Sequence, residues 1–407
     1  MYASSTYFLN CTRTSGGSID GSVKIQVDVP AGHLKVDRRV IASGVAAWAK
    51  VFANLDGDGK LDVIVSGGPT LGRRIVWYSS SSDYRSSHEL APTGGGEDLA
   101  VADIDGDGLA DVIGAGIKDD PVGNVVGHNK IVWLRNPGAA GATGRWAETV
   151  VQSNFVAHEL LVADFNGDGK TDILAQESST EEIVVFLQGS TPASWTRVTL
   201  LAAPLGIAVA RVNGDAYPDV VGHGFWLRNP GPGGGAWARF DFDTTLQGGI
   251  GQGGSTIVAD NLDGVTGQLD VVLAPSELSN NARGPLARYR LAPGANPELA
   301  SGWEKTILVS DALNVHMMRV ADMDKNGRKD VVFAEMHTTG IAPLRLGILL
   351  NQGPGAGFIA QTVHGAGSHN LALGDADGDG WIDIVGSNQE VDAADRGALS
   401  IWYGGRN

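Results

Sequence analysis

The chain has 407 residues and a formal net charge of −16 at pH 7. This acidity argues against a nucleic acid or an anionic membrane as a partner, because both are themselves negatively charged. Cys11 is the only cysteine, so the chain forms no disulfide within itself. No apolar stretch reaches the roughly 18 residues from which a membrane-spanning helix is predicted.

Residues 1–33 are polar and irregular in pattern, and they lack the basic region and long apolar run of a signal peptide. We expect residues 34–407 to form a single domain. Asn10, Cys11 and Thr12 form a glycosylation sequon, a common pattern that is compatible with secretion.

A nine-residue pattern recurs seven times after this segment. Its most regular copy is DIDGDGLAD at 103–111, and the copies begin at residues 54, 103, 164, 211, 261, 322 and 375. The copies at 211 and 261 are eroded. Short hydrophobic runs of strand composition flank the copies. The starts of successive copies lie 47 to 61 residues apart. A repeat of this length matches one four-stranded blade, so the sequence predicts an all-β, seven-bladed β-propeller.

The two chain ends each supply part of one blade in this prediction. A strand near Val36 to Ile41 has no nine-residue pattern ahead of it, and the last blade ends after its third strand, at Ile401 to Tyr403. We expect the first segment to complete the last blade and close the ring, because closure removes an exposed sheet edge.

The five regular copies carry Asp or Asn at positions 1, 3, 5 and 9 and Gly at position 6. Hard oxygen ligands around a tight turn are what calcium requires, and strands rather than EF-hand helices flank these loops. We predict up to five Ca²⁺ sites; the alternative is an acidic turn that binds nothing. Arg211 would place a cation among the ligands of the fourth copy, so the two eroded copies are predicted to be metal-free. The predicted ligands are Asn54, Asp56, Asp58, Asp62, Asp103, Asp105, Asp107, Asp111, Asp164, Asn166, Asp168, Asp172, Asp322, Asp324, Asn326, Asp330, Asp375, Asp377, Asp379 and Asp383.

These repeats resemble the FG-GAP or VCBS type found in integrin α-subunits and in many bacterial and fungal propellers. The resemblance covers nearly the whole chain and implies the propeller fold. It leaves the function open, since the family includes adhesins, lectins, polysaccharide lyases and sugar dehydratases. Calcium loops of extracellular modules bind with Kd values of roughly 10⁻⁴ to 10⁻³ M, so we expect a secreted or cell-surface protein whose leader is not in this chain.

Eight of the ten tryptophans recur at equivalent places in the third and fourth strands of the predicted blades, which indicates packing between blades. They are Trp77, Trp133, Trp146, Trp195, Trp226, Trp237, Trp303 and Trp402. Trp381 lies inside a calcium loop. Trp48 lies outside these recurring places, where the first strand of a blade is predicted to begin.

That position comes six residues before each loop, where the first strand of a blade begins. The first strand of a blade lines the central channel of a propeller. We call these seven places the axial positions; around the ring they hold Trp48, Glu97, His158, Leu205, Ser255 or Gly254, His316 and His369. The chain has nine histidines, and three of them in seven equivalent places are more than a random distribution would give.

The second strand of each blade runs back to the same face, so its end adds further polar groups there. From both sets we predict His158, His316, His369, Glu97 and His337 as catalytic residues. The predicted substrate-binding residues are Trp48, His223, Glu335 and Gln389. Insertions at 116–130, 276–288 and 337–345 are expected to wall a cleft on this face. His33, His88, His128 and His364 are expected at the solvated surface.

Three imidazoles with a carboxylate suit a transition metal such as Zn²⁺, which would act as a Lewis acid or supply a hydroxide. Without a metal, the imidazoles can serve as general bases near neutral pH. A third possibility is that they fill the channel and bond main-chain carbonyls or water.

Two enzyme groups make a catalytic interpretation concrete by resemblance. One is the propeller domain of aldos-2-ulose dehydratase, in which axial histidines and a metal act on a keto-sugar. The other is the seven-bladed polysaccharide lyases, which cleave uronate chains with a His and Tyr pair. None of the seven tyrosines here lies in an axial position or at a second-strand end, which favours a metal or histidine mechanism.

The sequence therefore favours elimination chemistry on a uronate-containing glycan or a keto-sugar. The alternative is a calcium-dependent lectin or adhesion module with Trp48 as a stacking platform. A third hypothesis is a structural partner-binding propeller. The expected partner is a glycan or sugar-derived ligand.

Overall fold

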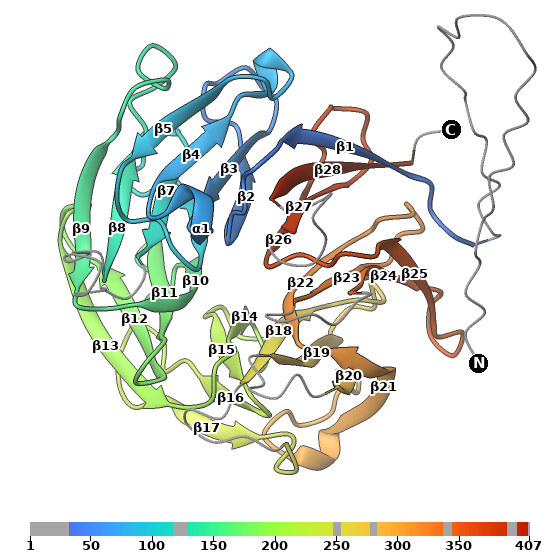
Figure 1. Ribbon diagram of the computed structural model, residues 1–407. Helices are drawn as coiled ribbons and strands as arrows, with labels where there is room; N and C mark the ends of the chain where they lie inside the picture. Colours follow the sequence, from blue (N-terminus) through green and yellow to red (C-terminus); the bar gives the residue numbers. More distant parts are fainter. Residues whose placement is uncertain are drawn as a thin grey trace, which may run out of the picture. The chain divides into compact units, whose positions relative to one another are not determined.

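The computed structural model describes residues 32–116, 129–246, 254–276, 283–336, 344–388 and 397–405. Within these ranges the chain forms seven antiparallel sheets of four strands, arranged around a ring (Figure 1). The predicted all-β, seven-bladed propeller is confirmed. No helix of the described residues is long and apolar enough to cross a membrane.

Six blades each use four consecutive strands. Blade 1 contains β2 (Ala49–Ala53), β3 (Asp62–Ser66), β4 (Ile75–Tyr78) and β5 (Ser87–Ala91). Blade 2 contains β6 (Leu99–Ala102), β7 (Asp111–Ala115), β8 (Lys130–Arg135) and β9 (Ala147–Ser153). Blade 3 contains β10 (Ala157–Ala163), β11 (Asp172–Glu177), β12 (Glu182–Gln188) and β13 (Trp195–Ala202).

The next three blades repeat this order. Blade 4 contains β14 (Ala208–Ala210), β15 (Asp219–Gly222), β16 (Phe225–Arg228) and β17 (Ala238–Asp241). Blade 5 contains β18 (Gly254–Asp260), β19 (Leu269–Ser276), β20 (Arg283–Leu291) and β21 (Trp303–Leu313). Blade 6 contains β22 (Val315–Ala321), β23 (Asp330–Glu335), β24 (Leu346–Asn351) and β25 (Phe358–His364).

Blade 7 combines strands from both ends of the described chain. It contains β26 (Leu371–Gly374), β27 (Asp383–Asn388), β28 (Ala398–Gly404) and β1 (Val36–Ala42). Strand β1 pairs antiparallel with β28, so that Asp37 faces Tyr403 and Arg39 faces Ile401. The described helical elements are the short α1 (Gly68–Leu71), η1 (Ser80–Ser82) and η2 (Ala300–Gly302).

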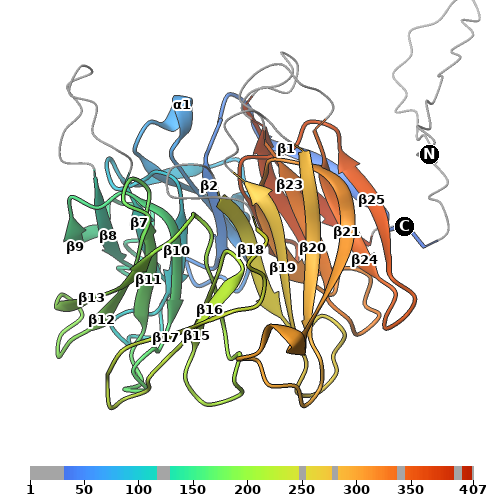
Figure 2. The same cartoon turned by 90° about the horizontal axis from the view of Figure 1, so that it is seen from below.

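Burial changes from the middle to the rim of each blade. The second strands, such as β3 and β7, are buried along their whole length, which explains their continuous runs of Val and Ile. The fourth strands, such as β9 and β13, have many exposed side chains and lie at the rim in Figure 1. The first strands lie nearest the axis of the ring (Figure 2 gives the view from the side).

The hydrophobic core is divided into clusters between neighbouring blades rather than gathered in one centre. One cluster joins blades 1 and 2 and includes Trp77 and Trp146, and another joins blades 2 and 3 around Trp133. The recurring tryptophans pack in these clusters. Trp195 and Trp237 are half-buried at the edges of theirs.

An amide side chain at the end of the third strand connects each of several blades to the blade before it. The amide nitrogen of Asn136 donates to the carbonyl of Leu55 at 3.1 Å, across the boundary between blades 2 and 1. Equivalent bonds run from Gln188 to Ile104, from Asn229 to Phe165 and from Asn351 to Leu262. The accepting residue is always the second residue of a nine-residue loop, so one repeat orients the next.

We expect Asn136→Ala to lower the free energy of unfolding by about 3 kcal/mol, because the carbonyls of Leu55 and Ala110 would both lose a buried donor. Urea unfolding followed by tryptophan fluorescence measures this. Gln152→Ala, at the rim strand β9, is the matched control and should change stability by less than about 0.5 kcal/mol. Equal effects of the two substitutions would contradict a connecting role for Asn136.

Candidate functional site: an axial cavity and the loops opposite it

The first strand of each blade separates two functional regions. In blade 3, His158 lies at the start of β10, and the loop from Asp164 to Asp172 follows the end of the same strand. In blade 6, His316 and the loop from Asp322 have the same relation to β22. The axial positions therefore gather at one end of the first strands and the nine-residue loops at the other.

Two of the axial histidines lie at β-bulges. The pairing register shifts between Ala157 and Glu159 in β10, and between Val315 and Met317 in β22. His158 and His316 are the extra residues at these shifts. A bulge redirects a side chain and increases local twist, which is why bulges recur next to functional sites.

The structure brings five of the predicted residues together. The rings of Trp48 and His369 are stacked with centroids 5.9 Å apart, and the His369 and His316 centroids are 4.0 Å apart. His158 follows at 5.8 Å from His316. Glu97 completes the group, because its Oε2 lies 3.9 Å from Nε2 of His369. These side chains come from blades 1, 2, 3, 6 and 7.

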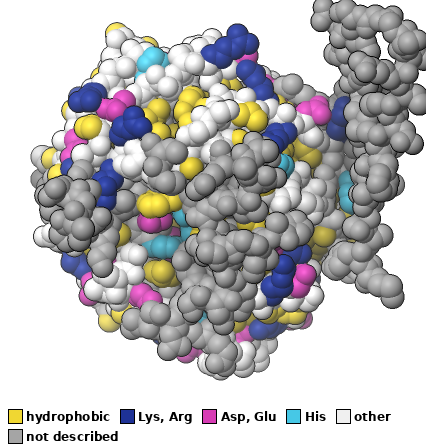
Figure 3. All heavy atoms as spheres, in the orientation of Figure 1, with side chains coloured by type: hydrophobic (Ala, Val, Ile, Leu, Met, Phe, Trp, Pro, Cys, Tyr) yellow, Lys and Arg dark blue, Asp and Glu magenta, His cyan; other side chains and the backbone are white. Residues whose placement is uncertain are grey.

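A cavity of about 320 Å³ adjoins this group and is lined by side chains of the first strands. Its walls include Glu97, His158 and His316, and apolar residues such as Leu161 and Val258. We call this space the axial cavity. Figure 3 shows histidine and acidic side chains close to the middle of the face seen in Figure 1.

Four charged or amide-bearing residues of the axial cavity were not identified from the sequence. They are Asp98, Glu159, Arg319 and Asn370, which lie one to three residues after the axial positions. Burial raises the pKa of Asp98, whose oxygens accept from the amides of Leu99 and Leu160. The only signal in the sequence is their polarity within otherwise apolar strand starts.

Two predicted substrate-binding residues contact partners outside the group of five axial side chains. Glu335 is fully buried, and its carboxylate pairs with Arg345 at 2.5 Å and accepts the amide of Leu313. Its side chain is thus committed to the interior of blade 6, and we leave it out of the proposed ligand-binding set. His223 Nδ1 lies 2.7 Å from the hydroxyl of Ser255, between blades 4 and 5. His337, Gln389 and His128 lie outside the described residues, as do most residues of the three insertions.

The regular loops have the geometry expected of cation sites. In three of them, carboxylate oxygens of positions 1, 3 and 9 lie within 4.8 Å of one another, and the residues are Asp103, Asp105 and Asp111, then Asp322, Asp324 and Asp330, then Asp375, Asp377 and Asp383. The other two regular loops replace one of these carboxylates by an Asn amide, at Asn54 and Asn166. An all-oxygen donor set of this kind fits calcium.

Backbone conformation explains the glycines of these loops. Gly106, at position 4, and Gly108, at position 6, have φ values of 75° and 85°. Only glycine adopts this left-handed conformation without a steric cost. Lys325 occupies position 4 of the sixth loop at φ 58°, so that loop carries a small backbone strain.

The ninth-position aspartate does more than complete a ligand set. In every blade it is at most 1% exposed, and one oxygen accepts the amide of the loop's second residue, as Asp111 accepts that of Ile104 at 3.1 Å. In six blades the other oxygen accepts a main-chain amide at the end of the third strand. In these six blades burial raises the pKa of the aspartate, to about 6 for Asp172 and Asp383.

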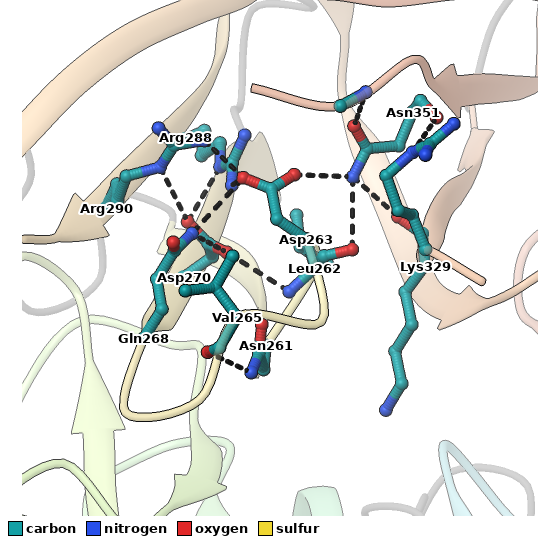
Figure 4. A network of polar contacts seen from close by, with 12 residues as sticks. Asn261, Leu262, Asp263, Val265, Gln268, Asp270, Arg288, Arg290, Lys329 and Asn351 are labelled. Atoms are coloured by element: carbon teal, nitrogen blue, oxygen red, sulfur yellow. Dashed lines mark hydrogen bonds and ion pairs between the residues drawn. The ribbon is translucent and has the colours of Figure 1, made fainter. Parts of the chain in front are cut away.

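In the fifth loop, arginine side chains from β20 contact the aspartates that correspond to predicted cation ligands of a regular loop (Figure 4). Arg288 contacts Asp263 and Asp270 at 2.7 Å each, and Arg290 also contacts Asp263. Both aspartates have fully buried side chains. A guanidinium thus supplies the balancing charge in this eroded copy.

The axial residues have a different geometry from the loops. Among the described residues, groups of three acidic or imidazole ligands within 4.8 Å occur in the nine-residue loops and not at the axis. His158, His316, His369 and Glu97 would therefore have to move closer together to hold a Zn²⁺ ion.

If the regular loops bind calcium, EDTA should lower the melting temperature and added calcium should restore it, since a ligand that binds the folded state stabilises it. Binding should weaken as the pH falls through about 6, because protonation of Asp172 and Asp383 removes a ligand charge. Calorimetry with Asp377→Asn should show one site fewer, whereas Arg211→Ala should leave the stoichiometry unchanged. A melting temperature that changes with neither EDTA nor calcium would refute calcium binding.

We expect Arg288→Met to destabilise the protein by about 3 kcal/mol in calcium-free buffer, because two buried carboxylates lose the nearer of their two guanidinium partners or share the remaining one, Arg290. Arg239→Met, which removes an exposed pairing with Asp241, is the control. Chemical denaturation in EDTA measures both. A loss for Arg288→Met no larger than for the control would show that the guanidinium does not balance the loop.

Comparison with known proteins supports the repeat and the fold. A family model described as FG-GAP-like repeat matches residues 35–114 and 164–222. No curated protein sequence is similar enough to count as a match.

Among solved structures, BBS1N in complex with ARL6DN is 13% identical over 91% of this chain and 96% of its own, with a TM-score of 0.54. The Penicillium chrysogenum alpha-L-arabinanase complexed with arabinobiose is 11% identical over 91% and 98%, with a TM-score of 0.50. The Bacillus licheniformis rhamnogalacturonan lyase PL11 is 16% identical over 88% and 71%, with a TM-score of 0.45. The arabinanase complexed with arabinobiose is thus among the structures of similar fold. The FG-GAP-like repeat model thus matches residues 35–114 and 164–222 of a chain that folds into a seven-bladed β-propeller.

Proposed function

We propose that this propeller is carbohydrate-active and carries out an elimination at the axial cavity, on a uronate-containing glycan or a keto-sugar. The observation that supports it is the group of Trp48, His369, His316, His158 and Glu97 at a cavity of about 320 Å³. Such a volume accommodates one or two sugar units. Imidazoles, a carboxylate and an indole are the groups that proton transfer and sugar stacking require.

In the proposed reaction, a neutral imidazole removes the proton from the carbon next to a carbonyl or carboxylate group. The electrons of that C–H bond form a C=C bond, and the oxygen substituent on the following carbon leaves with its bonding pair. A second, protonated imidazole gives that oxygen its proton. His316 and His369 suit this pair of roles, because their rings are neighbours at 4.0 Å.

Two residues orient His369 in this scheme. The Trp48 ring lies against it at an angle of 23° between ring planes and limits its rotation. The Glu97 carboxylate, 3.9 Å from Nε2, favours the protonated imidazole. His369 is therefore assigned the acid role and His316 the base role.

The product of either elimination contains a C=C bond conjugated with a carbonyl or carboxylate and absorbs in the near ultraviolet. We expect the wild-type protein to generate this absorbance from a keto-sugar or from uronate oligosaccharides. His316→Gln should lower the rate about 100-fold or more, the usual contribution of a general base. His88→Gln, in strand β5 against Trp77, is the control and should retain activity. Unchanged turnover in His316→Gln would remove the base assignment.

A lectin or adhesion module is the second candidate, because the half-buried Trp48 ring, which stacks on His369, offers an aromatic surface beside the axial group. If the protein is a lectin, we expect Trp48→Ala to reduce glycan affinity and the histidine substitutions to have little effect.

A Zn²⁺-assisted elimination is a third possibility. Elemental analysis after dialysis would then find about one transition metal per chain, lost in His316→Gln. Secretion, with calcium in the regular loops, is the localisation that fits these proposals.

A further inference from the structure

Beyond the histidines, the axial cavity is lined by the acceptor oxygens of three side chains and by the donors of Arg319 and Thr256. Asp98 and Asn370 precede strands β6 and β26, and Glu159 lies in β10. The amide nitrogen of Asn370 lies 3.5 Å from Asp98 Oδ1. Blade 1 separates the blades of these two residues, so their contact spans part of the ring.

Asn370 is fully buried, yet its Oδ1 accepts no hydrogen bond from any described residue. A buried carbonyl without a donor is costly, so a cavity that holds one is expected to provide the donor from water or from a ligand. Glu159 repeats this feature. Its Oε2 is buried without a described donor, while Oε1 is 3.8 Å from Nδ1 of His158.

The charges of the lining have the same sign as a uronate. Glu97, Asp98 and Glu159 contribute three negative charges, and Arg319 contributes one positive charge, which leaves a net charge of −2 with neutral imidazoles. If either Asp98 or, as in its acid role, His369 is protonated, the net charge is −1. Arg319 donates to the carbonyl of Met318 at 2.9 Å. A carboxylate ligand would therefore enter against net repulsion, in a space where water screens charge weakly.

We propose that the axial cavity takes an uncharged, polyhydroxylated ligand, a neutral sugar or keto-sugar, whose hydroxyl groups donate to Asn370 Oδ1 and Glu159 Oε2. This inference rests on the proposed function and selects one of its two substrate classes. A bare cation would also suit acceptor groups, but a cavity of about 320 Å³ is far larger than one ion requires. Sugar hydroxyls match both the volume and the acceptors.

The test compares matched ligand pairs by isothermal titration calorimetry: D-glucose with D-glucuronate, D-galactose with D-galacturonate, and D-fructose as a keto-sugar. We expect at least one uncharged sugar to bind, and each uronate to bind about tenfold more weakly than its neutral partner or not at all. Tighter binding of a uronate than of its neutral partner would overturn the proposal. Failure of every uncharged probe at tens of millimolar would also overturn it.

Two substitutions separate the charge of the lining from its hydrogen bonds. Glu159→Gln keeps an acceptor oxygen and removes a charge, so the ratio of uronate to neutral-sugar affinity should rise about tenfold. Glu182→Gln removes a carboxylate from β12, where it pairs with Arg197, and should leave the ratio unchanged. An unchanged ratio in Glu159→Gln would overturn the electrostatic argument.

Asn370→Leu removes the acceptor at similar volume and should weaken neutral-sugar binding about tenfold. The melting temperature of the Asn370→Leu variant shows whether it is folded. If it is not, the same measurement is made with Asn370→Ala. Retained affinity in a folded variant would overturn the assignment of Asn370. Calcium or Zn²⁺ that binds in the cavity and displaces the sugar would overturn the ligand class.

These binding measurements do not depend on turnover. A neutral sugar that binds as expected without any near-ultraviolet product would refute elimination and leave the ligand class intact. Conversely, turnover of uronate chains would support the proposed function while refuting this inference.

Discussion

A buried aspartate at the end of each nine-residue repeat is the constraint on which the rest of the ring depends. Its two oxygens hold the start of the loop and, in six blades, the end of the third strand, as Asp111 holds Ile104 and Asn136. Asn136 in turn donates to the preceding blade. One carboxylate thus fixes the loop, aligns three strands of its own blade and positions the side chain that contacts the preceding blade. The eroded loops keep this aspartate, at Asp219 and Asp270, although they have lost the pattern of a cation site.

Repetition explains how much of the fold could be predicted from the sequence. Seven copies of one pattern give the number of blades, and the fixed distance from the pattern to the start of the first strand gives the axial positions. The neighbourhood of His316 and His369 follows from that geometry, since equivalent residues of a ring face the same axis. The strand from Val36 could be assigned to the last blade because blade 7 otherwise lacked one strand.

What could not be predicted depends on differences between blades. Asp98, Glu159, Arg319 and Asn370 lie at related positions, yet no two of these residue types are the same and no periodic signal marks them. Glu335 ends a second strand as expected, but Arg345 on the neighbouring segment draws its carboxylate into the interior. A pattern in one strand carries no information about a partner in another. The bulges at His158 and His316 are similarly invisible to strand propensity.

The composition of blade 7 determines how the ring responds to mechanical force. Strands β1 and β28 are antiparallel, and Val36 pairs with Gly404, so the chain enters and leaves the blade at the same corner. Tension applied between these two points loads the hydrogen bonds one after another, as in a zipper, rather than all at once in shear. The first bonds to carry load lie at that corner, where Gly405 donates to the carbonyl of Lys35. Force between the ends would therefore peel β1 from the rim at low tension, while the other six blades, each built from one continuous segment, carry no load until β1 has detached.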